Sequence, residues 1–111
     1  MYENIHTEKA AGFDIVFSVT YEDSQPDWDF ETEEDKQDLL RRIENGDLVW
    51  FIARVQAYKN GVLLGTDYLG GCCYDSYMQF VEEGGYYTDM VETAVSNARQ
   101  TIAELTEGEP A

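Results

Sequence analysis

Two strand-like segments joined by Asn60-Gly61 constrain the fold more than any other feature of the sequence. The residues from Leu48 to Lys59 alternate between an apolar face and a second, mixed face, as in a strand of a sheet. Asn-Gly is a strong signal for a two-residue hairpin because both positions tolerate a positive φ angle. We therefore expect an antiparallel return strand from Val62 to about Gly71.

A simple two-residue hairpin also predicts which residues face one another. The expected pairing sets Arg54 opposite Asp67 as a charge pair on the less apolar face. It also sets Trp50 opposite Gly71, where the indole ring could cover a bare backbone. The remaining expected neighbours are Ala57 with Leu64, Ala53 with Tyr68, and Ile52 with Leu69.

The segments before this hairpin predict one strand and one helix. Residues 1–10 are polar and show no clear period, whereas residues 12–22 alternate with a period of two and predict a half-buried strand. Thr32 can cap a helix that begins at Glu33, and Gly46 is a natural stop. Its acidic first turn and its basic last turn, with Arg41 and Arg42, match the helix dipole.

Two further helices are expected after the hairpin. A short one spans Tyr77–Glu82, with Asp75 or Ser76 as its cap and Gly84-Gly85 as its end. A longer one spans about Asp89–Leu105 with Thr88 as its cap, and the tail should fray. The order β-α-β-β-α-α predicts one α+β domain over residues 1–111, with fraying termini. Its three-stranded antiparallel sheet would carry the helices mainly on one face.

Acidic side chains dominate the electrostatics of the chain. Its 111 residues hold 23 acids and 7 bases, a formal net charge of −16, and about half of that charge lies in Glu22–Asp38. Such a field repels nucleic acids and anionic membranes and attracts basic surfaces. Trp28 and Phe30 within the segment indicate an ordered surface rather than a disordered tail. The carboxylates expected to form a partner-binding surface are Glu22, Asp23, Asp27, Asp29, Glu31, Glu34, Asp35 and Asp38.

Catalytic and metal-binding patterns are weak. One histidine, His6, and two adjacent cysteines cannot supply a zinc site, and the acids near Asp27 match a calcium loop poorly. A nucleophilic role for Cys72 or Cys73 would need His6 as a base, and nothing in the sequence brings them together. We expect no cofactor, no metal and no enzymatic activity. We expect both cysteines to be free thiols whose pKa is raised by the surrounding acids.

The amino terminus shows no signal peptide, and no apolar run is long enough to span a membrane. Together with the cysteine usage, this predicts a cytoplasmic protein. The tyrosines crowded between Tyr68 and Tyr87 fit either core packing, with their hydroxyls at the rim, or an interface.

The run GTDYLGGCCYDSYMQF, Gly65–Phe80, followed by YYTDMVETAV, Tyr86–Val95, resembles a group of small acidic proteins encoded by phages and mobile elements. In size and charge the chain is also similar to DNA-mimic anti-restriction and anti-CRISPR inhibitors. That second class shares physical properties rather than a fold, so the resemblance carries over no functional residue.

Two functional hypotheses follow, ahead of a third, a small enzyme, which the sequence favours least. In the first, the chain is a non-enzymatic inhibitor of phage origin, active in the cytoplasm of the host cell. Its carboxylates would replace the phosphates of nucleic acid and block a basic DNA- or RNA-binding defence protein. In the second, it binds a protein partner, or forms a homodimer, through an apolar sheet face. That face would contain Trp50, Ile52, Tyr58 and Leu69. Neither hypothesis involves direct binding of nucleic acid or membrane.

Overall fold

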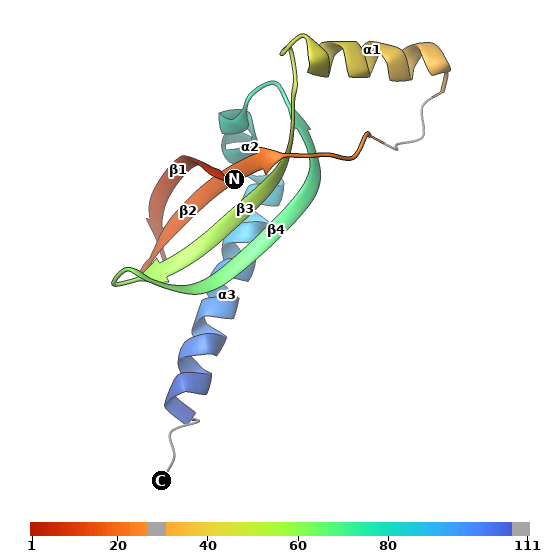
Figure 1. Cartoon of the computed structure of the whole chain (residues 1–111). Coiled ribbons are helices and arrows are strands. Elements are labelled where there is room, and N and C mark those ends of the chain that lie inside the picture. Colours follow the sequence, from red (N-terminus) through yellow and green to blue (C-terminus); the bar gives the residue numbers. More distant parts are fainter. Residues whose placement is uncertain (27–30, 108–111) are drawn as a thin grey trace.

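The computed structural model describes residues 1–26 and 31–107 and shows an α+β fold, as predicted (Figure 1). Its antiparallel sheet has four strands in the order β1-β2-β3-β4, however, and not three. The elements in chain order are β1 (Glu3–Ala10), β2 (Phe13–Tyr21), α1 (Glu33–Glu44), β3 (Val49–Lys59), β4 (Val62–Tyr74), α2 (Tyr77–Glu83) and α3 (Gly85–Glu107).

The strand that the sequence did not predict is β1, which pairs with β2 along the outer edge of the sheet. Ala11 and Gly12 join the two strands in a tight turn and both have positive φ angles, 54° and 86°. An edge strand is solvated on one side, so its residues need not alternate cleanly. Ile5 and Ala10 are its residues that pack on the core, which explains why no period was visible.

The predicted register of the β3–β4 hairpin is wrong beyond its first pairs. Next to the turn, Lys59 faces Val62 and Tyr58 faces Leu63, as a two-residue hairpin requires. Irregularities between Ala57 and Tyr58 and between Phe51 and Ala53 then shift the pairing. Each extra residue on β4 moves its partners by one position. The observed pairs are Ala57 with Gly65, Arg54 with Tyr68, Ala53 with Leu69, and Trp50 with Cys73.

The register shift also removes the predicted pair of Arg54 and Asp67. Asp67 faces Val55, so it lies on the other face of the sheet from Arg54. The Arg54 guanidinium instead lies 3.9 Å from the centroid of the Tyr2 ring, and its Nη2 donates a hydrogen bond of 3.4 Å to Ser18 Oγ. Arg54 therefore ties β3 to β2 and to Tyr2, the residue just before β1, on the face that α2 and α3 leave open.

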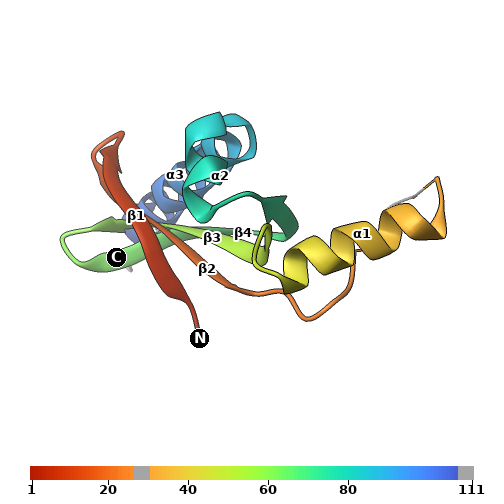
Figure 2. The ribbon, with the colours of Figure 1, turned by 90° about the horizontal axis from the view of Figure 1, so that it is seen from above.

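Helices α2 and α3 cover one face of the sheet and enclose the core (Figure 2). The largest fully buried side chains of the core are Phe17, Phe51, Phe80, Ile15 and Val55. The rings of Phe17 and Phe80 stack with their centroids 5.3 Å apart, which joins β2 to α2. This packing accounts for the alternating apolar positions of β2 and β3.

The caps of α2 and α3 differ in part from expectation. Ser76 caps α2, because its hydroxyl accepts a hydrogen bond of 3.1 Å from the backbone N–H of Gln79. Helix α3 begins at Gly85 rather than Asp89, and the N–H of Thr88 already donates to Gly84 O at 2.7 Å. Thr88 is thus a residue of the first turn and not the cap. Gly84, with φ of 79°, is the residue that separates the two helices.

Candidate functional site

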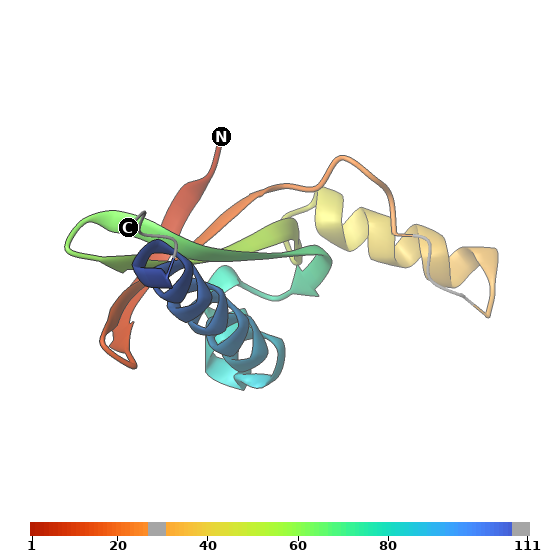
Figure 3. The ribbon, with the colours of Figure 1, turned by 90° about the horizontal axis from the view of Figure 1, so that it is seen from below.

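Helix α1 projects beyond the end of the sheet as a separate arm (Figures 1 and 2), and the view from below shows the same (Figure 3). None of its residues is buried. The chain leaves β2 at Tyr21 to reach the arm and returns directly into β3 at Val49. The arm therefore presents most of its surface to solvent, and its carboxyl end is the one that lies next to the sheet (Figure 1).

Local sequence signals explain why the arm is helical. Thr32 has extended backbone angles, and its hydroxyl accepts a hydrogen bond of 3.1 Å from the Asp35 N–H, as predicted for an N-cap. Acids fill the first turn, and Arg41 and Arg42 occupy the last, which complements the helix dipole. The helix ends at Glu44 and is capped by Asn45, whose N–H donates to Arg41 O at 2.9 Å.

The predicted acidic residues of the arm are all exposed. Glu31, Glu34, Asp35 and Asp38 lie in or just before its first half. Glu34 and Asp38 are four residues apart, so they share the face that is opposite the half-buried Leu40 and Ile43. Asp38 accepts a hydrogen bond of 3.3 Å from Arg41, whereas within the described ranges Glu34 and Asp35 take part in no ion pair. Negative charge thus collects on the amino-terminal half of the arm.

Glu22 has a structural role inside the protein. It is half-buried, and its carboxylate accepts a hydrogen bond of 2.9 Å from the backbone N–H of Gly71. The Trp50 ring covers the same glycine, with its Cη2 atom 3.5 Å from the position of a Cβ there. The ring does cover bare backbone, although Trp50 pairs with Cys73. Because its carboxylate is engaged in this way, Glu22 is a poor candidate for contact with a partner.

The other predicted acids have different surroundings. Asp23 is exposed and lines a hollow between α1 and the end of the sheet. Asp27 and Asp29 lie outside the described residues. The predicted acidic surface is therefore defined here by Asp23 and the exposed acids of the arm, and we call these five residues the acidic arm surface: Asp23, Glu31, Glu34, Asp35 and Asp38.

The hollow beside α1 has a volume of about 640 Å³. Its apolar lining comes from Leu40 and Ile43 of the arm, and from Tyr21, Pro26 and Trp50 of the sheet end and the chain that leaves it. The Trp50 indole donates a hydrogen bond of 2.6 Å to Ser24 O, which fixes the ring against this chain segment. Sequence reasoning missed the hollow, because only the tertiary placement of α1 creates it.

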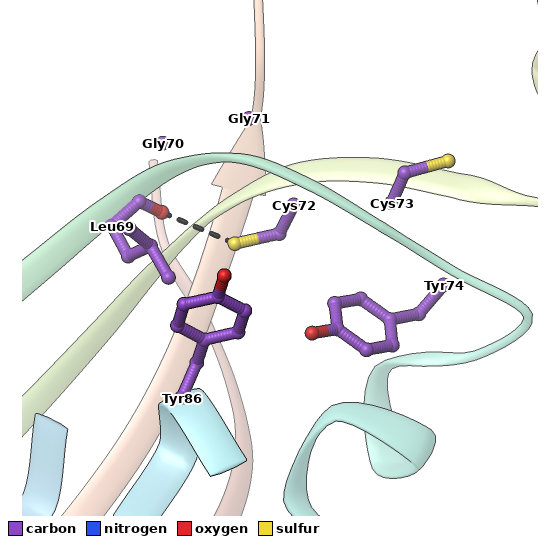
Figure 4. Close-up of a pocket in the computed structure, with 7 residues that line it drawn as sticks. All are labelled: Leu69, Gly70, Gly71, Cys72, Cys73, Tyr74 and Tyr86. Carbon is purple, nitrogen blue, oxygen red and sulfur yellow. Dashed lines mark hydrogen bonds between the residues drawn. The ribbon is translucent and has the colours of Figure 1, made fainter. Parts of the chain in front are cut away.

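A second cavity, of about 320 Å³, surrounds the two cysteines at the far end of β4 (Figure 4). Cys72 is buried, and its thiol donates a hydrogen bond of 3.3 Å to Leu69 O. The Cys73 side chain points away from the Cys72 side chain (Figure 4). Both are free thiols. Burial raises the pKa of Cys72 to about 11, with a smaller contribution from the charge of Glu22. Burial also raises the pKa of Cys73.

The histidine that could have activated a cysteine lies elsewhere. His6 is on β1 and the cysteines are on β4, which are the two outer strands of the sheet. His6 Nε2 is 3.0 Å from Glu8 Oε2, and the Tyr87 hydroxyl donates to the same oxygen at 2.7 Å. Burial, followed by this hydrogen bond to Glu8, raises the pKa of Tyr87. The cluster joins β1 to α3, and among the described residues His6 pairs with neither Cys72 nor Cys73.

The apolar sheet face of the second hypothesis is not continuous. Trp50 is buried, and Leu69 pairs with Ala53 and packs against the core on the helix-covered face. Ile52 and Tyr58 lie on the open face, but Arg54 and Gln56 separate them along β3. The four residues proposed for this contact therefore form no single patch.

Within the described ranges, no group of three or more histidine, cysteine or carboxylate side chains is placed to hold a metal ion. None of the described helices is long and apolar enough to cross a membrane.

Comparison of the chain with protein-family models, with curated proteins and with solved structures gave no match. The resemblance of Gly65–Phe80 and Tyr86–Val95 to acidic phage proteins is neither supported nor opposed by that result.

Proposed function

We propose that the chain is a non-enzymatic, phage-encoded inhibitor that presents the acidic arm surface to a nucleic-acid-binding host defence protein. The observation that carries this proposal is the position of α1, which holds its carboxylates in solvent beyond the end of the sheet. A scaffold that needed these acids only for solubility could distribute them anywhere on its surface. Here seven acids and three bases fall within residues 31–47.

The spacing of the acids is compatible with recognition in place of phosphates. Carboxylates at i and i+4 on a helix, such as Glu34 and Asp38, lie about 5–6 Å apart at their Cβ atoms. Duplex DNA carries one charge per roughly 1.7 Å of helix axis, counting both strands. One helix face therefore approaches but does not equal the charge density of DNA. Arg41 and Arg42 restrict the mimicry to the amino-terminal half of the arm.

Salt dependence and matched charge removal test the proposal. The immobilised protein is used to capture host proteins at about 0.1 M and about 1 M sodium chloride, over which the Debye length falls from about 10 Å to about 3 Å. We expect a nucleic-acid-binding protein to be retained only at low salt and to be released by duplex DNA. The variant Glu34→Gln/Asp35→Asn/Asp38→Asn should lose this capture.

The matched control is Glu82→Gln/Asp89→Asn/Glu92→Gln, which removes three exposed acids from α2 and α3. Both triple variants change the net charge equally, so a difference between them locates the contact on the arm. Equal loss of capture in both would show that only net charge matters. Unchanged capture in the arm variant would contradict the proposal.

A further inference from the structure

Both sides of the hollow beside α1 contribute apolar side chains to a lining that is otherwise polar. Leu40 and Ile43 are half-buried on the arm, and Trp50 and Pro26 are buried on the other side. Tyr21, which also lines the hollow, leaves 72% of its surface in solvent. The volume of about 640 Å³ lies within the roughly 300–1,000 Å³ of clefts that take drug-sized ligands.

The charges around the hollow have one sign. Asp23 and Glu44 contribute to its lining, whereas no basic residue among the described ones does so. The lining is completed by uncharged polar groups from Ser24, Gln25 and Gln37. A lining that combines apolar side chains with two carboxylates is complementary to a segment that carries both apolar and basic side chains. A second copy of this chain, with its net charge of −16, fits poorly.

We propose that this hollow is the docking site for a basic segment of the partner protein. Bulky apolar side chains of that segment would pack against Leu40, Ile43 and the exposed Tyr21 ring, while its lysines or arginines contact Asp23 and Glu44. The inference rests on the proposed function and adds a second kind of contact to it. Charge on the arm supplies attraction at a distance, and the hollow supplies apolar burial and selects among basic partners.

Titration calorimetry with model peptides tests the docking site. The probes are a short peptide of lysine and leucine and its counterpart in which alanine replaces every leucine. Burial of a single leucine side chain that would otherwise stay in water is worth roughly a tenfold gain in affinity or more. We therefore expect the leucine peptide to bind the full chain at least about tenfold more tightly than the alanine peptide.

A pair of variants separates apolar packing from charge. Leu40→Glu places a carboxylate within the hollow, and Leu39→Glu places one on the neighbouring half-buried position, which does not line it. Both variants add one negative charge, so purely electrostatic binding predicts tighter binding of the leucine peptide to each. Docking in the hollow instead predicts that the Leu40→Glu protein no longer binds the leucine peptide more tightly than the alanine peptide. The Leu39→Glu protein should still prefer the leucine peptide.

The outcomes distinguish this inference from the proposed function. If both peptides bind equally and release at high salt, the hollow plays no part and the inference is overturned, while the acidic arm surface stands. If the leucine peptide is preferred but the arm variant captures host proteins as well as the wild type does, the proposed function fails and the hollow remains a binding site. Failure of the leucine peptide to bind, or its equal binding to Leu40→Glu and Leu39→Glu, also overturns the inference.

Discussion

The carboxylate of Glu22 accepts a hydrogen bond of 2.9 Å from the backbone N–H of Gly71, a residue 49 positions later in the chain. This bond attaches the segment that leaves β2 to the irregular part of β4, where Gly71 has a φ angle of 67°. The Trp50 ring covers the same glycine. The point at which the chain departs for the arm is therefore held by contacts with two other strands.

The first prediction concerns this attachment. Replacing Glu22 with alanine leaves the half-buried Gly71 N–H without its acceptor, which should lower the free energy of unfolding by about 1–3 kcal/mol. The measurement is urea unfolding followed by circular dichroism. The control is Asp23→Ala, which removes an exposed neighbouring acid and should change stability by no more than about 0.5 kcal/mol. Equal effects of the two variants would contradict the structural role of Glu22.

The second prediction concerns the contact between β4 and α3. A Cβ atom at Gly65 would meet the backbone carbonyl oxygen of Ala94 and would lie 2.7 Å from the backbone nitrogen of Ala98. These are backbone atoms, so α3 itself would have to move. We expect Gly65→Ala to cost about 3 kcal/mol or more, at or above the upper end of ordinary overpacking.

Gly70→Ala is the comparison for that variant. A Cβ there meets only the end of the Glu22 side chain, 3.0 Å away, which can shift more easily. Its cost in urea unfolding should be clearly smaller than that of Gly65→Ala. A Gly65→Ala protein as stable as the wild type would show that α3 does not pack on β4 as described.

Gly65 also explains why the register of the β3–β4 hairpin could not be predicted. A local rule continues the pairing from Asn60-Gly61 and sets Leu64 beside Ala57. The structure sets Gly65 beside Ala57, where only a residue without a side chain allows α3 to approach. That requirement comes from a helix about thirty residues away and leaves no trace in the strand pattern. The alternation, the turn and the helix caps at Thr32 and Ser76 are local signals, and they were predicted correctly.

The candidate site likewise contains features that the sequence predicts and features that only the tertiary structure shows. The exposure of Glu34, Asp35 and Asp38 follows from helical periodicity and from the short apolar stripe of α1, both of which are visible in the sequence. The hydrogen bond of Glu22 to Gly71 and the hollow beside α1 depend on distances between separate elements. No spacing rule reports such distances, so these two features required the structure.

The third prediction tests the independence of the arm. Thr32→Ala removes the N-cap of α1 and should weaken that helix by about 1 kcal/mol. Because α1 buries none of its residues, hydrogen exchange should accelerate at α1 amides while the global unfolding midpoint stays almost unchanged. Ser76→Ala is the matched cap removal on α2, whose Phe80 is in the core. It should lower the global midpoint, and a similar global loss in Thr32→Ala would contradict an independent arm.

The fourth prediction concerns salt. A net charge of −16 destabilises the compact state by repulsion, and added salt screens that repulsion. We expect the melting temperature to rise between low and moderate sodium chloride, with roughly 4 °C for each 1 kcal/mol in a domain of this size. The arm variant Glu34→Gln/Asp35→Asn/Asp38→Asn should show a smaller rise. A melting temperature that is flat or falls with salt would argue against a dense acidic surface.

The last prediction follows from the buried thiol of Cys72, whose pKa is raised by burial from the ordinary 9.0 to about 11. The folded protein therefore holds this proton at pH values where the unfolded chain has released it. The contribution of the Cys72 thiol to the free energy of unfolding is fully present below about pH 9 and is lost as the pH rises toward 11. Urea unfolding across this range should show a steeper loss in the wild type than in Cys72→Ala.

The comparison is sharpest below pH 10, because Tyr74 and Tyr87 also have raised pKa values above their ordinary 10.0 and contribute at higher pH. Cys72→Ala lowers stability at every pH by leaving a cavity, so the slope with pH is the informative quantity and the absolute value is not. Cys73→Ala serves as the control, since Cys73 is only half-buried and should alter the slope less. Parallel slopes in the wild type and Cys72→Ala would mean that the Cys72 thiol ionises as readily in the folded protein as in the unfolded chain, contrary to its burial at the end of β4.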